Sequence, residues 1–322
     1  MEVRGNVKQL VFMMAVMLVI LISFTACGKS AEQQIAEQLE LGNKYLTEAD
    51  YEAAIVAFNK VITLDEKNAA GYIGLMDVYQ KNGNTDKAIQ CGESGLEKND
   101  EDSLKNKLLE VYQKKQLEAE GDDLLRISLY RKMLQLDSEQ ESVYLELAAL
   151  YETQHDYEQS MEVLRDGLGN VVNPENLRRK FRQTMDSCKE YLLDTIKGRF
   201  NVEIRGTSFR DYNGDKNYEL FAIGKMAGLN EESIYYCGNS GKICEQIYTI
   251  NLQENNPGCA FCDIEYQGQT YFCPYFDTEG YIFGIKDGMP FTLAENLKVP
   301  DGEVEKIEAY FTEVVAQKYD HY

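Results

Sequence analysis

Residues 39–68 read LELGNKYLTEADYEAAIVAFNKVITLDEKN, and their pattern recurs further along the chain. Residues 73–100, IGLMDVYQKNGNTDKAIQCGESGLEKND, align with them at a spacing of 34, so that Leu41, Tyr45 and Ala54 correspond to Leu75, Tyr79 and Ala88. A repeat of this length is one supersecondary unit whose apolar face only the next unit can cover. The sequence therefore predicts a stacked helical array in the first half of the chain.

A third copy, YLELAALYETQHDYEQSMEVLRDGL, occupies residues 144–168. Between it and the second copy, residues 103–140 span 38 positions, which we interpret as a degenerate repeat with four extra residues in its inner turn. Small residues at Gly42, Ala54, Ala88 and Ala148 allow neighbouring helices to approach closely, and the aromatic residues fill the space between layers.

The pattern resembles the tetratricopeptide repeat, a helix–turn–helix unit with a Leu-Gly pair followed by Tyr, Ala and Phe. Leu41, Gly42, Tyr45, Ala54 and Phe58 match it, whereas its Trp and closing Pro are missing. The resemblance implies a superhelix that binds a protein or peptide partner in a concave groove. On the family's spacing, the residues that point into this groove are Leu39, Asn43, Leu46, Ile73, Asp77, Gln80, Leu145, Ala149 and Glu152.

The first residues indicate where the chain resides. Arg4 and Lys8 precede an apolar run from Leu10 to Phe24, which is short for a membrane-spanning helix and typical of a signal peptide. The small residues Thr25 and Ala26 stand before Cys27, which resembles the lipobox of bacterial lipoproteins. The resemblance implies cleavage after residue 26, lipidation of Cys27 and attachment to the extracytoplasmic face of the cell membrane. An uncleaved anchor helix is the alternative.

The formal net charge of the chain is −21. A strongly acidic protein repels nucleic acid and anionic lipid headgroups, so we exclude both as electrostatic partners. Membrane attachment is expected through the lipid anchor alone.

From about residue 199 the pattern changes to short aromatic and β-branched runs separated by Gly, Asn and Asp, as an antiparallel sheet requires. A closing segment places Val304, Ile307, Phe311, Val314 and Val315 at helical spacing, and we expect it to pack on the sheet. The predicted class is α+β, with several domains. Their expected bounds are 1–26 for the signal peptide, 27–34 for the tether, 35–168 for the repeats, 170–198 for a capping helix and 199–322 for the β domain, including a helix over 301–320.

The stretch DYNGDKNYE, residues 211–219, places oxygen ligands at alternate positions, namely Asp211, Asn213, Asp215, the Asn217 carbonyl and Glu219. This order suits Ca²⁺ and resembles the D-x-N-x-D loops of integrin-type repeats. The sixth position, usually Gly, is Lys216. The sequence predicts a structural calcium site, and a metal-free Asp/Asn turn is the alternative.

Cys259 and Cys262 have the spacing of a redox motif, but they lie in a run that we expect to be a strand, where they face opposite sides. A two-residue turn at Gln267-Gly268 places Cys262 opposite Cys273. This register predicts a cross-strand contact or disulfide between them, and a pair of small buried thiols is the alternative.

Catalytic motifs are scarce, since the chain has two histidines, His155 and His321, and no phosphate loop or H-E-x-x-H motif. We therefore expect a non-enzymatic surface protein that docks a protein partner. The competing hypothesis is a calcium-assisted carbohydrate or cell-wall binder, with sugar-stacking surfaces supplied by Tyr235, Tyr236, Tyr271, Tyr275 and Tyr281.

Overall fold

The computed structural model describes residues 29–226, 228–229, 231–251, 259–276, 279–300 and 302–319. The predicted signal peptide and Cys27 lie outside these residues. None of the helices in the described part of the chain is both long enough and apolar enough to span a bilayer.

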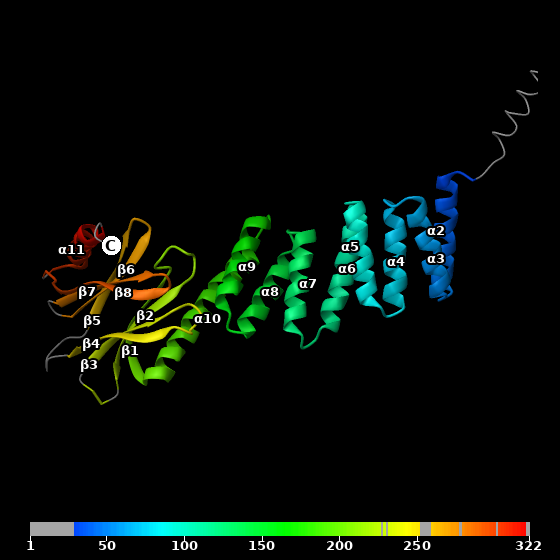
Figure 1. Ribbon diagram of the computed structural model, residues 1–322. Coiled ribbons are helices and arrows are strands. Elements are labelled where there is room, and N and C mark those ends of the chain that lie inside the picture. The colour runs from blue at the N-terminus through cyan, green and yellow to red at the C-terminus, as the bar shows by residue number, and fades with distance from the viewer. Residues whose placement is uncertain are drawn as a thin grey trace, which may run out of the picture. The chain divides into compact units, whose positions relative to one another are not determined.

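The described residues fall into two compact units that divide between Leu136 and Asp137. The described residues of the N-terminal unit form the helices α2 (Ala31–Thr47), α3 (Tyr51–Leu64), α4 (Ala69–Lys81), α5 (Thr85–Lys98), α6 (Asp102–Glu118) and α7 (Asp123–Leu136), joined by short turns (Figure 1). The C-terminal unit begins with α8 (Glu141–Thr153), α9 (Tyr157–Asn170) and the 26-residue α10 (Glu175–Phe200). Eight strands and α11 (Val304–Tyr319) follow among its described residues.

The inner turns confirm the repeat. Each of them has one residue in the left-handed region, at Ala49, Gly83, Gly121 and His155, with φ between 56° and 85°. The next residue is Asp or Asn in every case, and its side chain accepts a hydrogen bond from the backbone three residues later, at the start of the second helix.

The spacing of these turns locates the four extra residues of the third repeat. The left-handed positions are 34, 38 and 34 residues apart. α6 ends three residues later than the 34-residue spacing from α4 places it, and four residues instead of three separate it from the next helix. The prediction that all four extra residues enlarge the inner turn is therefore wrong for three of them, which lengthen α6, and correct for one.

Small residues allow the helices of the N-terminal unit to pack closely, as predicted. A Cβ added at Gly74 would lie 2.3–2.6 Å from three ring carbons of Phe58, and one added at Gly42 would lie 2.7–3.0 Å from the same ring. The Phe58 ring therefore fills the space between α2 and α4, and only glycine on both helices leaves room for it. Ala54, Ala88 and Ala148 are fully buried.

The β half contains two four-stranded antiparallel sheets. In one sheet the order is β1 (Val202–Arg210), β2 (Glu219–Met226), β3 (Glu231–Cys237) and β4 (Cys244–Asn251). In the other it is β5 (Cys259–Tyr266), β6 (Gln269–Phe276), β7 (Glu279–Lys286) and β8 (Met289–Lys298). The predicted class of helical repeats followed by an antiparallel β domain with a terminal helix is confirmed.

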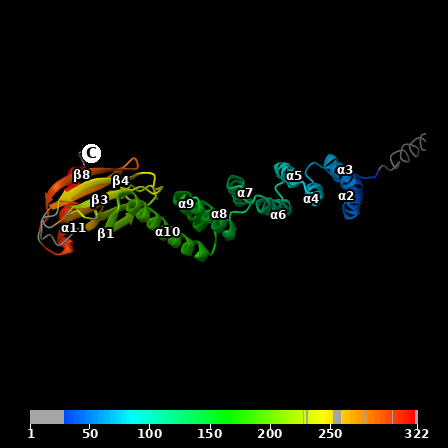
Figure 2. The same cartoon turned by 90° about the horizontal axis from the view of Figure 1, so that it is seen from below.

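The C-terminal unit has four layers, in the order α10, first sheet, second sheet, α11 (Figures 1 and 2). Leu192 and Ile196 of α10 pack on one face of the first sheet, while Phe221 and Phe272 stack between the sheets with ring centroids 4.9 Å apart. Ile307, Phe311 and Val315 of α11 are buried on the outer face of the second sheet, and Val314 is partly buried there. Val304, at the start of the predicted stripe, is 55% exposed and does not belong to it.

Burial on both faces changes the role of the aromatic residues. Tyr235, Tyr236, Tyr271 and Tyr281 are at most 3% exposed, and Tyr275 is half-buried. The four buried tyrosines belong to the cores between and outside the sheets and offer no exposed ring to a sugar. The stacking role expected of these four is therefore wrong, because covering both faces of a sheet buries most residues along its central strands.

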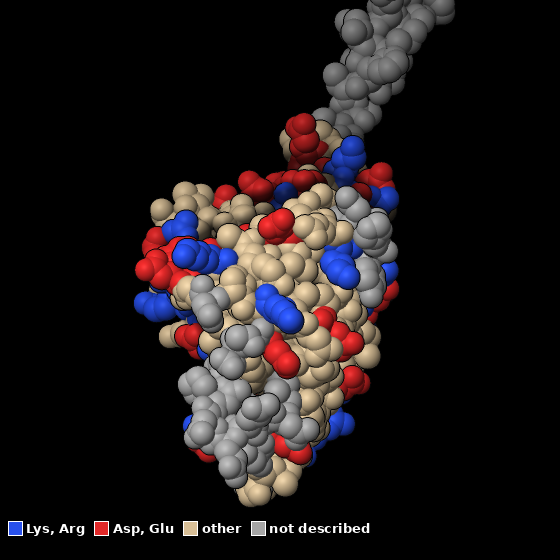
Figure 3. Space-filling view, turned by 90° about the vertical axis from the view of Figure 1, so that its left-hand side faces the viewer, with Lys and Arg blue, Asp and Glu red and all other residues tan. Residues whose placement is uncertain are grey.

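Figure 3 shows the face of the molecule at the left-hand side of Figure 1. On the atoms drawn in colour, lysine and arginine lie interspersed with acidic residues and uncharged side chains, and neither sign forms a block. This face therefore gives no electrostatic indication of a partner.

Candidate functional site

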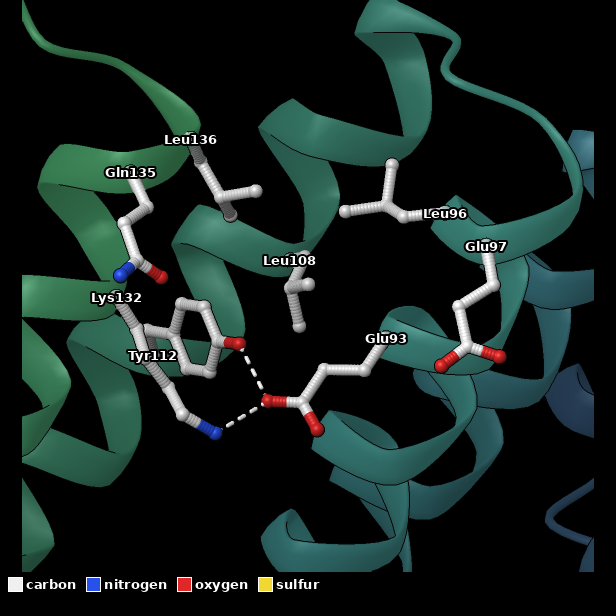
Figure 4. A pocket seen from close by; sticks show the side chains of 8 residues that line it. All are labelled: Glu93, Leu96, Glu97, Leu108, Tyr112, Lys132, Gln135 and Leu136. Carbon is white, nitrogen blue, oxygen red and sulfur yellow. Dashed lines mark hydrogen bonds and ion pairs between the residues drawn. The ribbon is translucent and has the colours of Figure 1, made fainter.

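A pocket of about 360 Å³ opens in the N-terminal unit between α5 and α7, above α6 (Figure 4). Its volume is at the lower end of the range of ligand pockets. The lining residues are Glu93, Leu96 and Glu97 of α5, Leu108 and Tyr112 of α6, and Lys132, Gln135 and Leu136 of α7. The pocket thus lies between the second helices of two successive repeats.

Close packing of α5 on α6 fixes the floor of this pocket. A Cβ at Gly92 would lie 2.9 Å from Leu108 Cδ1, and one at Gly95 would lie 2.9 Å from Leu104 Cδ2. The absence of side chains at these two positions lets α6 approach α5 closely. Leu108 is fully buried and is therefore held at the bottom of the pocket.

A polar trio forms one wall of the pocket. The hydroxyl of Tyr112 donates to Glu93 Oε1 over 2.7 Å, and Lys132 Nζ donates to the same oxygen over 2.5 Å (Figure 4). Lys132 Nζ also lies 5.7 Å from the centroid of the Tyr112 ring. The trio therefore connects all three helices that line the pocket.

Electrostatics in the trio favour a charged carboxylate. Burial alone would raise the pKa of Glu93, but the hydrogen bonds from Lys132 and Tyr112 outweigh it and hold the pKa below its ordinary value. Burial and the neighbouring Glu93 raise the pKa of Tyr112, so its hydroxyl keeps its proton and remains a donor. Glu93 and Lys132 thus neutralise each other at neutral pH.

Glu97 supplies the remaining charge. It is exposed at the rim, one helical turn beyond Glu93, and no hydrogen bond or ion pair is recorded for it in the described part of the chain. The lining therefore has a net charge of −1, from two glutamates and one lysine. An apolar floor below a negative rim suits an aliphatic side chain that ends in a positive charge, as in lysine or arginine.

The groove residues predicted from the repeat spacing lie on the first helices of the repeats. In the N-terminal unit, Asn43 is exposed, whereas Leu39, Leu46, Ile73, Asp77 and Gln80 are half-buried. Asp77 pairs with Lys107 over 2.7 Å, and the Gln80 carbonyl accepts a hydrogen bond from Lys114. The polar groups at these two positions therefore already bind α6.

In the C-terminal unit, the predicted groove residues lie on α8. Ala149 is exposed and Leu145 is half-buried. Glu152 pairs with Lys180 of α10 over 2.6 Å and accepts a hydrogen bond from the buried Thr184. Its carboxylate joins α8 to α10.

The predicted calcium loop connects β1 to β2 and contacts α9. Arg165 donates to the Lys216 carbonyl over 2.6 Å, and Asn217 donates to Glu158 over 3.3 Å. Lys216 has φ +70°, so it adopts the left-handed conformation that glycine usually supplies at the sixth position. Gly214 is left-handed as well, at φ +78°.

The ligand side chains of this loop bind its own backbone. Asp211 accepts from the N–H groups of Gly214 and Lys216, and Asp215 accepts from that of Asn217. Within the described ranges, no three His, Cys, Asp or Glu side chains gather closely enough to hold a metal ion. Asn213 and Asp215 are hydrogen-bonded to each other. Calcium binding stays a prediction, because these donors would have to turn to converge on an ion.

Glu219, at the ninth position of the loop, is 4% exposed and accepts a hydrogen bond from the Tyr212 N–H. Burial raises the pKa of Glu219 to about 8, and the nearby Asp211 and Asp215 add to this effect.

The cysteine register is as predicted. Tyr266 pairs with Gln269 across the turn, and Cys262 lies opposite Cys273. Gln267 and Gly268 have φ values of +49° and +83°, as a two-residue hairpin turn requires. Both cysteines are buried free thiols, so the disulfide between them stays a prediction.

Sequence reasoning missed the pocket. Tyr112 is 19 residues and Lys132 is 39 residues from Glu93, and no helical periodicity connects positions so far apart. One usable signal is the pair of glycines at 92 and 95 in the middle of a predicted helix, since they show that another helix approaches closely there.

A protein-family model supports the repeats. Residues 45–109 match the family model of the tetratricopeptide repeat. No curated protein matches the sequence. Among solved structures, a crystal structure of MamA protein is 14% identical over 54% of this chain and 100% of its own, with a TM-score of 0.31. A thermophilic tetratricopeptide-repeat protein of Thermus thermophilus is 17% identical over 51% of this chain and 89% of its own, with a TM-score of 0.26. The chain therefore contains tetratricopeptide repeats in its first half, as residues 45–109 show directly.

Proposed function

We propose that this protein is a non-enzymatic scaffold that docks a protein partner on its helical repeats. The observation that carries the proposal is the pocket between α5 and α7, in which an apolar floor meets the unpaired carboxylate of Glu97. The partner inserts a lysine or arginine whose aliphatic stem contacts Leu96 and Leu136 and whose charge faces Glu97. The net charge of −21 on the whole chain favours the approach of such a basic partner.

The proposal includes the location of the scaffold. Cleavage before Cys27 and lipidation of that residue attach the repeats to the extracytoplasmic face of the cell membrane. Two acyl chains suffice for stable anchoring, whereas one does not. Mass analysis of the protein from its native cells tests this part, since an intact Met1 contradicts it.

Site-specific cross-linking in intact cells tests the docking site. A photoreactive amino acid replaces Gln135 at the rim of the pocket, and in a control it replaces Val56, which is 70% exposed on α3. A protein captured from position 135 and absent from position 56 is then purified, and its affinity for the chain is measured directly.

Two variants decide whether the pocket makes the contact. Leu96→Ala and Glu97→Lys are each expected to weaken binding about tenfold, because residues at the centre of an interface contribute on the order of 1–2 kcal/mol. Glu52→Lys makes the same charge change at an exposed position of α3 and should leave the affinity unchanged. Binding that survives both pocket variants but is lost in Ile73→Ala would place the partner on the first helices instead and overturn the proposal.

We also propose that the loop 211–219 binds Ca²⁺ as a structural ion, with Asp211, Asn213, Asp215, the Asn217 carbonyl and Glu219 as ligands. The left-handed backbone at Lys216 supports this, because the chain already makes the turn that such loops need. Isothermal titration with Ca²⁺ tests the proposal. Heat that persists in Asp211→Ala would exclude the loop as the site.

A further inference from the structure

Cys237 and Cys244 form a second cross-strand pair, which the sequence pattern did not reveal. They are the last residue of β3 and the first of β4, and they lie directly opposite each other. Both thiols point to the face of the first sheet that α10 covers, and they are 0% and 2% exposed.

The hydrogen-bond pattern shows which kind of pair this is. The N–H of Gly238 donates to the Ile243 carbonyl over 2.8 Å, so Gly238 and Ile243 are a hydrogen-bonded pair. Pairs alternate along an antiparallel ladder, and Cys237 and Cys244 are therefore a non-hydrogen-bonded pair, in which the Cβ atoms are about 4.5 Å apart. A disulfide needs Cβ atoms about 3.5–4.5 Å apart, which this pair supplies with little movement.

Cys262 and Cys273 are the opposite kind of pair. The two-residue turn closes on Tyr266 and Gln269, which are hydrogen-bonded to each other by the turn geometry. Cys262 lies four residues before Tyr266, so it and Cys273 are also a hydrogen-bonded pair, in which Cβ atoms are typically about 5.5 Å apart. A pair of this kind is the less favourable site for a disulfide, which needs Cβ atoms about 3.5–4.5 Å apart.

We propose that Cys237 and Cys244, and not Cys262 and Cys273, are the oxidised pair of this protein. The reaction is thiol–disulfide exchange with a small-molecule or protein disulfide. During refolding, the thiolate of one of the two cysteines attacks that disulfide and releases one thiol, and the thiolate of the other then displaces the second. The two cysteines lose two protons and two electrons, and the external disulfide gains them.

The surroundings of the two thiols differ in the folded, reduced protein. Arg199 donates to the Cys244 carbonyl over 2.8 Å, which places a guanidinium beside the thiol. The hydrogen bond from Cys237 lowers the pKa of Cys244, and the positive charge of Arg199 adds to this. Burial raises the pKa of the neighbouring Cys188 to about 12, so this third thiol stays protonated in the folded protein.

The disulfide would clamp a loop that attaches the sheet to the helices. Asn239, in the loop 238–243, donates to Glu158 of α9 over 3.3 Å, and its carbonyl accepts a contact from the Cys188 thiol of α10. Gly241 is left-handed, and a Cβ there would lie 2.8 Å from the Tyr191 ring. Closing the base of this loop keeps these contacts in place.

In the cell, oxidation rests on the export proposed above, but the chemistry can be tested without it. The full chain in detergent is unfolded with guanidinium and dithiothreitol, refolded in a mixture of reduced and oxidised glutathione, alkylated, digested and mapped by mass spectrometry. Because the thiols are buried in the folded protein, the disulfide should form during refolding and not when folded reduced protein is exposed to oxidised glutathione. A peptide pair joined through Cys237 and Cys244 is expected as the main linked product.

Thermal unfolding provides a second measurement. The oxidised protein should melt on the order of 5 °C above the reduced one, because the cross-link restricts the unfolded chain. The variant Cys237→Ser with Cys244→Ser should lose this difference, and the matched control Cys262→Ser with Cys273→Ser should keep it. A main product linked through Cys262 and Cys273, or complete alkylation of Cys237 and Cys244 after refolding, would overturn the proposal whether or not the protein is exported.

Discussion

The packing of Phe58 between two glycines predicts that Gly74→Ala destabilises the repeats. Alanine is the better helix former, and in an open helix position the substitution stabilises by about 1 kcal/mol. At Gly74 the new Cβ would lie 2.3, 2.4 and 2.6 Å from ring carbons of Phe58. Carbon atoms in favourable contact are about 3.5–4.0 Å apart, so the ring or the helix must move by more than about 1 Å.

The surroundings of Phe58 block the easy movement. The ring is 1% exposed, and Gly42 of α2 contacts its other side closely enough that a Cβ there would be 2.7 Å away. The helices must therefore separate, and overpacking of this kind costs about 1–3 kcal/mol. With the ring confined on both sides we take the upper end of this range. After subtraction of the propensity gain, the expected net loss is about 2 kcal/mol.

Urea unfolding by circular dichroism measures the loss, and hydrogen exchange of α3 and α4 locates it. Gly198→Ala is the matched control, since this helical glycine of α10 has no atom within 4 Å of an added Cβ and should gain up to about 1 kcal/mol. Phe58→Leu should recover part of the loss in the double variant, because the two sites are in direct contact. If Gly74→Ala is as stabilising as Gly198→Ala, the inferred confinement of the ring is refuted.

Three further predictions concern the C-terminal unit. In EDTA, the stability of the wild-type protein should fall relative to that of Glu219→Gln as pH rises from about 4.5 towards 8. The reason is that glutamate loses its proton in the unfolded chain over this range, whereas the buried Glu219 keeps it because its pKa is raised. If the urea midpoints of the two proteins differ by the same amount at pH 5 and at pH 8, this prediction is contradicted. Lys216→Gly should stabilise the metal-free protein by up to about 1 kcal/mol in thermal unfolding, because glycine adopts the left-handed conformation without the strain that lysine has there. A lower melting temperature would show that the lysine side chain stabilises the fold by more than this backbone strain costs. Glu152→Ala should lower the free energy of unfolding by about 1–3 kcal/mol and speed hydrogen exchange in α10. It leaves the buried Thr184 and its neighbour Lys180 without the carboxylate to which both donate. Unchanged hydrogen exchange would mean that the fold does not need this carboxylate.

The repeats were predictable because their determinants are local. A left-handed residue followed by Asp or Asn recurs in every inner turn, and small residues recur at the helix contacts. One contact between helices shows that the repeats do not correspond residue by residue. Gly92 leaves room for Met76 in the second repeat, whereas the corresponding positions of the fourth repeat hold Leu164 and Ala148, both fully buried. Large and small have exchanged places, so the contact still pairs one large residue with one small residue although neither position keeps its residue type.

The β half was less predictable because its layering depends on long-range contacts. The runs Leu220–Ile223 and Ile234–Cys237 are apolar without alternation, which indicates burial on both faces but does not say what covers each face. β8 was not predicted, since its second residue is Pro290 and polar residues interrupt it. A proline is tolerated there because β8 is the edge of its sheet.

The helix α10 explains why the last repeat and the β domain form one unit. Residues Thr184 and Lys180 in its first half bind Glu152 of α8, and Leu192 and Ile196 in its second half belong to the core of the first sheet. Glu158 of α9 accepts hydrogen bonds from two loops of that sheet, through Asn217 and Asn239. A helix that only capped the repeats would need a polar outer face along its whole length. The second half of α10 instead buries Leu192 and Ile196 against the first sheet, so one helix is both the cap of the repeats and the cover of the sheet. Neither part could lose the other without exposing apolar surface.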